Sequence, residues 1–389
     1  MSVEMTPSDV PDRALSRPIT EIARDTIVDP RIPALVPGFD APFFQAGLAG
    51  YSDGAMRLVA RRHGCPYCVT EALLDQTLIN GGKGRTREDP DILAEECGTG
   101  EVEENRAAGL DDHPIAGQIM GTYPDQMAHG AQILASMGYE TIDVNLACPV
   151  KKIRKRSRGG HFLSTPDEAI DILRAVRDAL PSEQKTTLKI RRAYDDTPEM
   201  AHNFERIFNA AYELGYIWAT VHCRTVRQKY LGPGRWAFLT DLTARYSDRI
   251  IFGSGDIWTV NDIFAMLDVT NVQAVSVARG CIGNPWIFRQ ARQLMAGEQP
   301  TPPTLDEQRC ALLEHFELSM ALHGESAASR MMRKFGIKFS THHPTPDRVK
   351  NEFIRCRSVD DWRSVLDRYY TNASISPESA IPHTTSTAP

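Results

Sequence analysis

The stretch TIDVNLACPVKKIRKRSRGGHFLSTPDEAIDILRAVRDALPSEQKTTLKIRR, residues 141–192, holds two short apolar runs on either side of a helical pattern. The runs, 141–147 and 186–192, are rich in β-branched residues and have the length of buried strands. Between them, apolar residues over 166–179 recur with the spacing of one helix face. A strand, a helix and a second strand in this order predict a βα unit with parallel strands.

Short apolar runs of the same kind recur along the chain, separated by helical patterns such as those over 123–137 and 198–214. The other runs are 42–47, 67–72, 114–120, 216–223, 249–255 and 272–278. Eight parallel strands that alternate with helices close into a TIM barrel, so we predict an α/β fold of this type. In such a barrel, the residues at the carboxyl ends of the strands form the active site.

The barrel pattern occupies residues 39–296, and other parts of the chain differ from it in composition. A Pro-rich linker leads into a smaller, all-helical domain that we expect over 305–371. Residues 1–38 are expected to form a flexible tail, and 372–389 a disordered one. A long acidic connection over 73–112 is either a lid or a mobile insertion, and its sequence does not decide between them.

Composition narrows the class of protein and its location. The chain has 389 residues, 42% of them hydrophobic, which excludes a disordered chain. Its net charge of -6 argues against indiscriminate nucleic-acid binding but leaves room for a local basic track. Its eight cysteines are scattered, which argues against a disulfide scaffold and a metal site. The chain shows neither a signal peptide nor a long apolar segment, so we expect a cytoplasmic protein without a membrane partner. We also expect a monomer, although the sequence does not decide the oligomeric state.

The motif GCPYC, residues 64–68, matches the dithiol site of glutaredoxins. A glutaredoxin site follows a strand and begins a helix, whereas this motif leaves the first helix and enters a strand. We therefore expect Cys65 and Cys68 to be packing residues and not a redox pair.

The carboxyl ends of the eight runs bring small and polar residues to one rim. In chain order these are Ala46, Gly47 and Leu48; Thr70 and Glu71; Gln118; Asn145 and Cys148; Lys189 and Arg191; His222 and Arg224; Ser254, Gly255 and Asp256; and Ala278, Arg279 and Gly280. A single Lys or His at a strand end is more often a rim or structural residue. Polar side chains at six strand ends of one rim instead indicate a functional site.

The last two strand ends, GSGDIWTVND and ARGCIGNPW, place small residues directly before a helix. Backbone N–H groups in such turns, together with the helix dipole, bind phosphate, and TIM barrels often have this site after strands seven and eight. Arg279 would add a charge-assisted contact. The pair of turns therefore predicts a cofactor that carries a phosphate.

Several motifs occur in an order that resembles the tRNA-dihydrouridine synthases. They are GLAGYSDGAMR, VTEALL, GQIMGTYPDQM, IDVNLACPVKKI, LKIR, VHCRTVRQKYLGPGRW, GSGDI and ARGCIGNPWIF. The resemblance covers residues 42–290, and 305–371 resembles that family's C-terminal helical domain. It implies an FMN-binding TIM barrel and an RNA-binding helical domain, with reduction of the C5=C6 bond of selected tRNA uridines by NADPH.

The resemblance also assigns site residues. FMN contacts would fall on Gly47, Leu48, Ala49, Gln118, Lys189 and His222, and the phosphate end on Ser254, Gly255, Asp256, Ala278 and Arg279. The family's proton donor corresponds to Cys148, with Asn145 and Arg191 on the substrate side. The chain departs from the family at Gly47 and Leu48, where Pro-Met is usual, and at Ser254, where Asn is usual. Ala147 and Ala278 replace glycines.

The chemistry of the reaction explains these residue types. A reduced flavin delivers a hydride to C6 of uracil, and negative charge develops on the C4 carbonyl until C5 is protonated. A thiol such as Cys148, with an ordinary pKa of about 8.5, is mostly protonated at neutral pH and can donate that proton. Lys189 and Arg191 alternate along a strand, so both can face the site and stabilise negative charge.

Six basic residues follow Cys148 within eight positions, from Lys151 to Arg158. A uridine in folded RNA must leave its stack to be reduced, and its flanking phosphates need cationic partners. We therefore expect RNA contacts from Lys151, Lys152, Lys155, Arg156 and Arg158, with Arg154 in the same run. The alternative for this run is a solvated basic loop.

Two further functions remain open at this point. An FMN barrel could reduce a free small molecule, as dihydroorotate dehydrogenases do, but it would not need the basic run. A non-catalytic RNA-binding descendant is disfavoured because Cys148, Lys189 and His222 are all present. The sequence decides neither the uridine position, nor tRNA against rRNA, nor NADPH against NADH.

Overall fold

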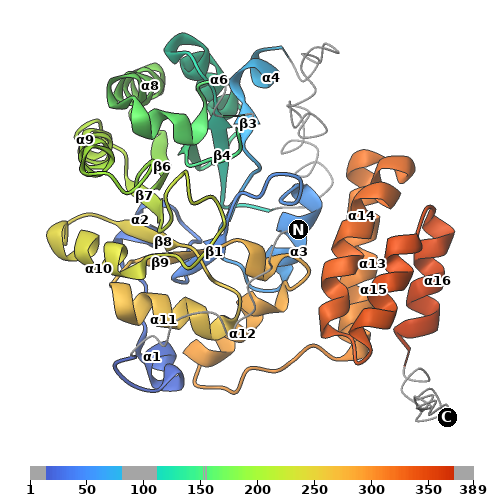
Figure 1. Cartoon of the computed structure of the whole chain (residues 1–389). Coiled ribbons are helices and arrows are strands. Elements are labelled where there is room, and N and C mark those ends of the chain that lie inside the picture. The colour runs from blue at the N-terminus through green and yellow to red at the C-terminus, as the bar shows by residue number, and fades with distance from the viewer. Residues whose placement is uncertain (1–14, 81–111, 152, 154–155, 372–389) are drawn as a thin grey trace, which may run out of the picture. The chain divides into compact units, whose positions relative to one another are not determined.

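The computed structural model describes residues 15–80, 112–151, 153 and 156–371 (Figure 1). The chain divides into two compact units. One comprises Met1–Cys281 with Pro285–Pro300, and the other Ile282–Asn284 with Thr301–Pro389. Ile282–Asn284 of the second unit lies within the range that we expect for the barrel domain, and the domain boundaries over 39–296 and 305–371 stay predictions.

The first unit is a closed barrel of parallel strands. Its strands are β1 (Phe43–Gln45), β2 (Cys68–Val69), β3 (Leu73–Leu74), β4 (Ile115–Met120), β5 (Thr141–Leu146), β6 (Lys185–Arg191), β7 (Trp218–His222), β8 (Ile251–Ser254) and β9 (Ala274–Val277). Each of the eight predicted runs contains or overlaps one of them. The sheet closes because β1 pairs with both β9 and β2, and β2 pairs with β4. The predicted TIM barrel is confirmed.

The short strand β3 was not predicted, because it lies within the long connection that begins at residue 73. It pairs in parallel with the end of β4, Leu73 opposite Ile119, and is followed directly by α4 (Asp75–Ile79). Residues 81–111 of the connection lie outside the described residues. The question of lid against insertion therefore stays open.

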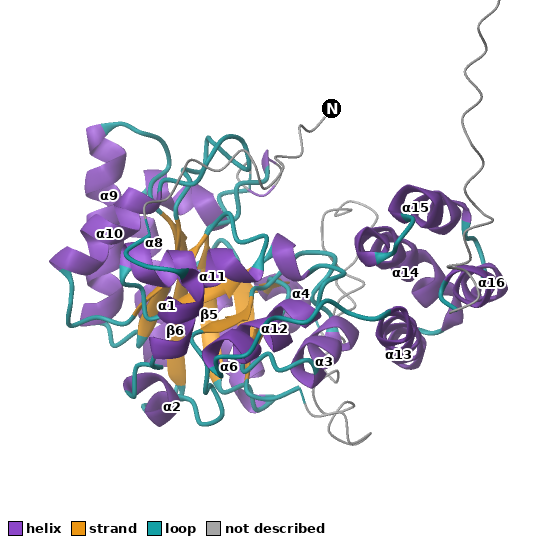
Figure 2. Cartoon of the chain, turned by 90° about the horizontal axis from the view of Figure 1, so that it is seen from below, coloured by secondary structure: helices purple, strands orange, loops and turns teal. Residues whose placement is uncertain are grey.

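Helices surround the strands of the first unit (Figures 1 and 2). They are α3 (Gly54–Arg62), α6 (Pro124–Ser136), α8 (Pro166–Ala179), α9 (Pro198–Glu213), α10 (Trp236–Arg245), α11 (Val260–Thr270) and α12 (Trp286–Met295). The three predicted helices, α6, α8 and α9, are confirmed. On α8 one face is formed by the buried residues Ala169, Ile172, Leu173 and Val176. They are three or four positions apart, which is about one helical turn.

Aromatic rings fill the barrel interior toward the amino ends of its strands. Phe39 stacks on Tyr67 with ring centroids 4.7 Å apart, and Trp218 lies 4.8 Å from Phe252. Phe44 contacts both Tyr67 and Phe252. These rings form an apolar plug at this end of the barrel, and the large cavity described below opens at the other end.

The prediction of a loose tail over residues 1–38 is wrong from residue 19 onward. Helices α1 (Ile19–Asp25) and α2 (Arg31–Leu35) form there, and they bury Ile22, Ala23 and Ile32. These helices are too short to show a sustained apolar period in the sequence. Residues 1–14 and 372–389 lie outside the described residues.

The second unit is helical, as predicted. It contains α13 (Leu305–His323), α14 (Glu325–Phe339), α15 (Pro346–Arg355) and α16 (Val359–Tyr369). Thr304 and Glu307 form a capping box that starts α13, and Phe316 stacks on Trp362 at 4.4 Å in the core. The basic residues of RMMRKFGIKF lie on α14, and their contact with RNA stays a prediction.

Candidate active site

A cavity of about 420 Å³ opens at the carboxyl ends of the barrel strands. Most predicted site residues line it: Gly47, Leu48, Ala49, Gln118, Asn145, Cys148, Lys189, Arg191, His222, Ser254, Ala278 and Arg279. Gly255 and Asp256 instead line a small adjoining cavity of about 30 Å³, which shares His222, Ser254, Ala278 and Arg279 with the large one. The fold thus brings together side chains from strand ends that are far apart in the sequence.

Sequence reasoning missed several residues that line the large cavity. They are mostly apolar: Ala46 at the end of β1, and then Ala72, Met120, Ala147, Pro149, Val150, Ile153 and Tyr230. Ala46 had been placed at its strand end without a role. Tyr230 could have been noticed in the motif RTVRQKYLGPGRW, but nothing in the sequence shows that this loop folds back over the rim. The polar residues at the strand ends were enough to predict where the site lies, and the structure added the apolar residues that line it.

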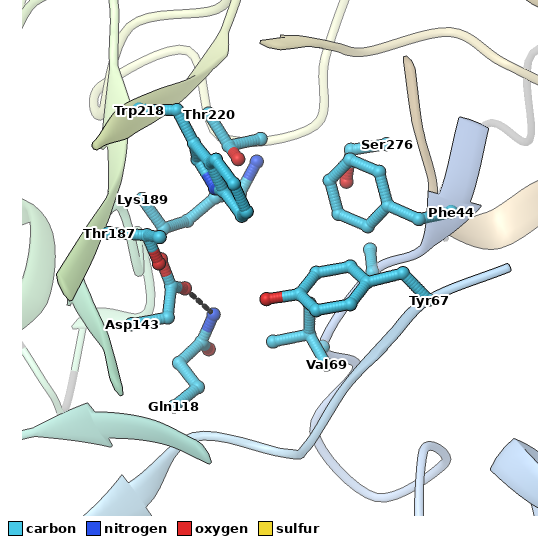
Figure 3. Close-up of a pocket in the computed structure, with 12 residues that line it drawn as sticks. Phe44, Tyr67, Val69, Gln118, Asp143, Thr187, Lys189, Trp218, Thr220 and Ser276 are labelled. Carbon is cyan, nitrogen blue, oxygen red and sulfur yellow. Dashed lines mark hydrogen bonds between the residues drawn. The ribbon is translucent and has the colours of Figure 1, made fainter. Parts of the chain in front are cut away.

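A chain of hydrogen-bonded polar side chains runs from the barrel interior to the cavity. Figure 3 shows its inner part, Gln118, Asp143 and Thr187, in a separate pocket of the barrel interior, and Gln118 also lines the large cavity. The Asp143 carboxylate accepts hydrogen bonds from Gln118 Nε2 and Thr187 Oγ1, each at 2.7 Å. Gln118 Oε1 accepts from Asn145 Nδ2 at 2.7 Å, and Asn145 Oδ1 accepts from the backbone N–H of Cys148 at 3.2 Å. Asp143 therefore fixes the orientation of both amides, up to the backbone of the predicted proton donor.

Asp143 lies behind the cavity lining, where it holds Gln118, and the sequence analysis did not name it. Its side chain is buried inside the barrel, and burial raises the pKa of its carboxyl. The signal for it was present, because Asp143 and Asn145 alternate along one strand and so face the same side.

The Lys189 ammonium is the main buried charge that faces the cavity. Its Nζ is buried and has no hydrogen-bond partner among the described residues. Burial lowers the pKa of Lys189 to about 8, with Asp143 opposing this effect and Arg191 adding to it. A buried cation without a hydrogen-bond partner fits an anionic or strongly polar ligand group, which would complete its coordination.

Cys148 lies half-buried at the edge of the cavity. Burial raises the pKa of its thiol, so the group is protonated at neutral pH. Two glycines pack against it: a Cβ on Gly159, whose φ is 55°, would lie 2.8 Å from the Cβ of Cys148, and the Gly160 N–H donates to the Cys148 carbonyl at 3.0 Å. The pair of glycines after the basic run is thus needed to bring the chain back over the thiol.

Arg191 connects two loops at the cavity rim. Its Nε donates to the carbonyl of Ala147 at 2.8 Å, and its Nη1 donates to those of Thr225 and Lys229 at 2.9 and 2.8 Å. Burial lowers the pKa of Arg191 to about 10, which leaves it charged at neutral pH. The guanidinium therefore holds the loops after β5 and β7 together in addition to facing the cavity.

His222 is a neutral hydrogen-bonding group of the site. Burial and the neighbouring Arg191 and Lys189 lower the pKa of its imidazole well below the usual range. Its Nδ1 accepts a hydrogen bond from the Arg224 N–H at 3.2 Å. In the neutral ring, Nε2 then carries the hydrogen and can donate to a ligand.

The carboxylate of Asp256 is taken up by partners within the protein. It forms a buried ion pair with Arg224 and accepts from the Gly234 N–H at 2.5 Å. A carboxylate repels a phosphate, so the predicted contact of Asp256 with the cofactor would have to use its backbone N–H. Arg279 is 3.8 Å from this carboxylate and stacks over Trp258 at 4.2 Å.

The basic run after Cys148 needs one correction. Arg158 is only 5% exposed, and it donates to Thr122 Oγ1 at 3.1 Å and to Gln76 Oε1 at 3.2 Å. Its predicted contact with RNA is therefore wrong, because the side chain anchors the loop from within. Lys151 is exposed, and Arg156 is half-buried with its carbonyl bonded to Thr122 Oγ1. Lys152, Arg154 and Lys155 lie outside the described residues.

This anchoring role gives a stability prediction. Arg158→Met should lower the free energy of unfolding by about 1–3 kcal/mol, because it removes hydrogen bonds from a buried charged group. Lys151→Met in the same loop should change it by less than about 0.5 kcal/mol, because Lys151 is exposed. Denaturant titration of both variants checks this, and an equal effect of the two changes would contradict the anchoring role.

Cys65 and Cys68 are buried, as expected for packing residues. Their Sγ atoms lie 3.8 Å apart, and Cys65 Sγ also donates to the Tyr67 carbonyl at 3.1 Å. In the described part of the chain, no cluster of three or more His, Cys, Asp or Glu side chains could hold a metal ion. None of the described helices combines the length and the apolar character needed to cross a membrane.

Comparison with known proteins relates this chain to one family. The family model for dihydrouridine synthases matches residues 44–374. A probable tRNA-dihydrouridine synthase of Treponema pallidum (strain Nichols) is 31% identical over 331 residues, which cover 83% of this chain and 91% of that protein. The tRNA-dihydrouridine synthase B of Shewanella oneidensis is 30% identical over 326 residues, covering 84% and 94%.

Solved structures share the fold at low sequence identity. The 6-hydroxypseudooxynicotine amine oxidase from Pseudomonas geniculata N1 has a TM-score of 0.51 at 10% identity, covering 87% of this chain and 66% of that chain. Histamine dehydrogenase from Rhizobium sp. 4-9 has a TM-score of 0.50 at 11% identity, covering 77% and 51%. These two likenesses concern the fold alone. The family model, by contrast, spans most of the sequence, and the chain belongs to the dihydrouridine synthase family.

Proposed function

We propose that this protein reduces the C5=C6 bond of uridines in tRNA, with FMN as its flavin and NADPH as the reductant. The observation that carries the proposal is the pairing of a protonated thiol, Cys148, with a buried ammonium, Lys189, in one cavity. Relatives over most of the chain are named tRNA-dihydrouridine synthases. This likeness favours an RNA uridine over the free small molecule of the dihydroorotate dehydrogenase-like alternative.

The residues of the cavity fit a flavin mononucleotide. A volume of about 420 Å³ lies within the range of ligand sites, and the strand ends supply both apolar and polar contacts. Gln118, Lys189 and His222 would hold the polar edge of the ring system. Ser254, Gly255, Ala278 and Arg279 line the adjoining small cavity and would hold the phosphate end.

FMN, when bound and reduced, would supply the hydride that adds to C6 of the uracil ring. Cys148 would then transfer its proton to C5, because burial keeps the thiol protonated until negative charge develops next to it. Asn145, held by Gln118 and by the Cys148 N–H, would position the uracil and the thiol relative to each other. Lys189 and Arg191 would stabilise the developing negative charge.

The RNA would approach the rim from which Lys151 is exposed. A target uridine must be extruded to reach the cavity, and a nearby cation would hold the adjacent phosphate. Since tRNA is the proposed substrate, the cytoplasm is the expected location, and a single chain would suffice for the site.

The exposed lysine of the basic run gives a binding prediction. Lys151→Gln should lower the salt slope of tRNA binding by about 0.7–0.9, as expected for one lost phosphate contact. Lys185→Gln is the control, because Lys185 begins β6 at the opposite end of the barrel. Binding of unmodified tRNA at several salt concentrations measures the slope for each variant. Equal slopes for the two variants would show that Lys151 is solvated and makes no phosphate contact.

The proposed function is tested by supplying the purified, FMN-loaded protein with NADPH and tRNA that lacks dihydrouridine. Nucleoside mass spectrometry should then show dihydrouridine, recognised by the mass gain of two hydrogen atoms. A protein that cannot be reconstituted with FMN, or that leaves all uridines unchanged, would refute the proposal.

A further inference from the structure

Exposed apolar side chains gather at the mouth of the cavity. Of the seven exposed large hydrophobic residues in the described part of the chain, four follow barrel strands at their carboxyl ends: Tyr123 after β4, Val150 after β5, and Tyr230 and Leu231 after β7. Val150 and Tyr230 also line the cavity. Single exposed apolar residues need no explanation, but a group of them around one opening indicates an interaction surface.

Leu231 is the most exposed of the four, at 65%. It lies in the loop between β7 and α10, residues 223–235, which we term the 223–235 loop. Three basic residues in this loop are also exposed, Arg227, Lys229 and Arg235, and Arg227 is paired with Asp195 at 3.4 Å. The apolar tip of the loop, Leu231, therefore has basic residues near it in the same loop. This combination matches a nucleic acid, which carries both negative phosphates and flat base rings.

Hydrogen bonds hold the 223–235 loop in one conformation. Arg191 Nη1 donates to the Lys229 carbonyl at 2.8 Å, and Arg224 Nε donates to that of Gly232 at 2.9 Å. Asp256 accepts from the Gly234 N–H. Side chains of the active site thus anchor the loop from below, so its tip is positioned relative to the cavity.

The tip itself is a closed turn. Both backbone polar groups of Leu231 are bonded to Gln228: its N–H donates to the Gln228 carbonyl, and its carbonyl accepts from Gln228 Nε2, each at 3.0 Å. Gln228 Nε2 also donates to the Pro233 carbonyl at 2.9 Å. The Leu231 side chain is consequently the part of the turn that remains available to a partner.

Tyr230 and Leu231 differ in their surroundings. The Tyr230 ring lies 5.6 Å from the Arg191 guanidinium and 5.8 Å from that of Arg279, and it lines the cavity. Leu231, the next residue, does not belong to the cavity lining. One residue of the turn thus borders the site where the reacting base would sit, and its neighbour lies outside that site.

We infer that Leu231 is the wedge that fills the gap left in the RNA stack when the target uridine enters the cavity. This inference rests on the proposed function and adds the means by which the uridine is extruded. Extrusion exposes the ring faces of the neighbouring bases, and an apolar side chain inserted between them replaces the lost stacking. A rigid turn suits this task because little conformational freedom is lost on insertion.

The experiment first maps the uridine that the parent protein converts, and then places 2-aminopurine at the nucleotide on its 3′ side in a synthetic tRNA. The FMN-loaded, oxidised parent should raise the 2-aminopurine fluorescence on binding, because the probe loses its stacking partner. Leu231→Ala should bind this tRNA but lose most of the rise, and its kcat/KM for tRNA should fall by about 10-fold or more. Leu231→Met should behave like the parent.

Two controls separate a wedge from a general defect. Reduction of the bound flavin by NADPH should be unchanged in Leu231→Ala, which shows an intact site. Ile27→Ala removes another exposed apolar residue, 86% exposed between α1 and α2, and should give the full fluorescence rise.

An unchanged rise and an unchanged kcat/KM in Leu231→Ala would overturn the inference. The same holds if the variant instead changes the oligomeric state in gel filtration, since the tip would then cover a protein partner. A parent protein that converts no uridine in tRNA would refute the proposed function, and the wedge with it.

Discussion

Replacing Cys148 with alanine is expected to leave a protein that binds FMN and is reduced by NADPH but hardly converts uridine. The expected loss in the rate of dihydrouridine formation is roughly 10²–10⁴-fold, which is the usual contribution of a positioned proton donor. Flavin reduction needs no proton from the thiol, so its rate should stay close to that of the parent. Stopped-flow measurement of each half-reaction separates the two effects.

Cys148→Ser provides the matched variant, since its hydroxyl has nearly the same shape but is a weaker acid. It should resemble the alanine variant more closely than the parent. In the parent, uridine reduction should decline as pH rises, first through the pKa of Lys189, about 8, and then through the thiol pKa, which burial places above its ordinary range. Unchanged turnover in Cys148→Ala would assign the proton donor to another group.

Replacing Lys189 with methionine should slow the reduction of bound flavin by roughly 10²–10³-fold, because a buried cation that stabilises developing negative charge is lost. Lys189→Arg should retain most of the rate, since it keeps the charge. Rapid mixing of each FMN-loaded variant with NADPH measures the effect. A methionine variant that is reduced as fast as the parent would contradict the role of the ammonium.

The pH dependence of the same step follows from the lowered pKa of Lys189. The ammonium form prevails below about pH 8 and is lost above it. A bound anion raises this pKa, so the alkaline limb of flavin reduction should lie at or above about pH 8. The limb should be absent in Lys189→Met and shifted to higher pH in Lys189→Arg.

Lys189 should also destabilise the FMN-free protein, which offers a test that does not depend on activity. A buried base whose folded pKa is lowered opposes folding below that pKa, and the penalty disappears above its unfolded pKa. Lys189→Met should therefore raise the Tm of the FMN-free protein at neutral pH. If Lys189→Met raises the Tm by the same amount above pH 10.5, the ordinary pKa of the group, the gain in stability would come from better packing of the methionine and not from the lost charge.

The barrel could be predicted because each of its strands is buried and short, and therefore appears as an apolar run. Strand β6 also shows why the site could be predicted. Lys189 is a charged residue near the carboxyl end of a strand that is otherwise mostly buried, and such a residue indicates a functional site. By contrast, α1 and α2 could not be predicted, because they are stabilised by packing against the barrel and not by a local period.

The roles of individual charged residues were harder to predict than their location. Arg158 belongs to a basic run, but its partners, Gln76 and Thr122, are distant in sequence. Asp256 follows a glycine turn typical of phosphate sites, yet it neutralises Arg224. A sequence shows which charges are present, and only the fold shows which of them already have partners.

The central claim, that electrons pass from a flavin in this cavity to a uridine in tRNA, is tested most directly by a single turnover without oxygen. The FMN-loaded protein is reduced with NADPH and then mixed with tRNA that lacks dihydrouridine, or separately with orotate. We expect tRNA to reoxidise the flavin with formation of one dihydrouridine per flavin, and orotate to leave it reduced. A flavin that stays reduced with tRNA and is reoxidised by orotate would contradict the account.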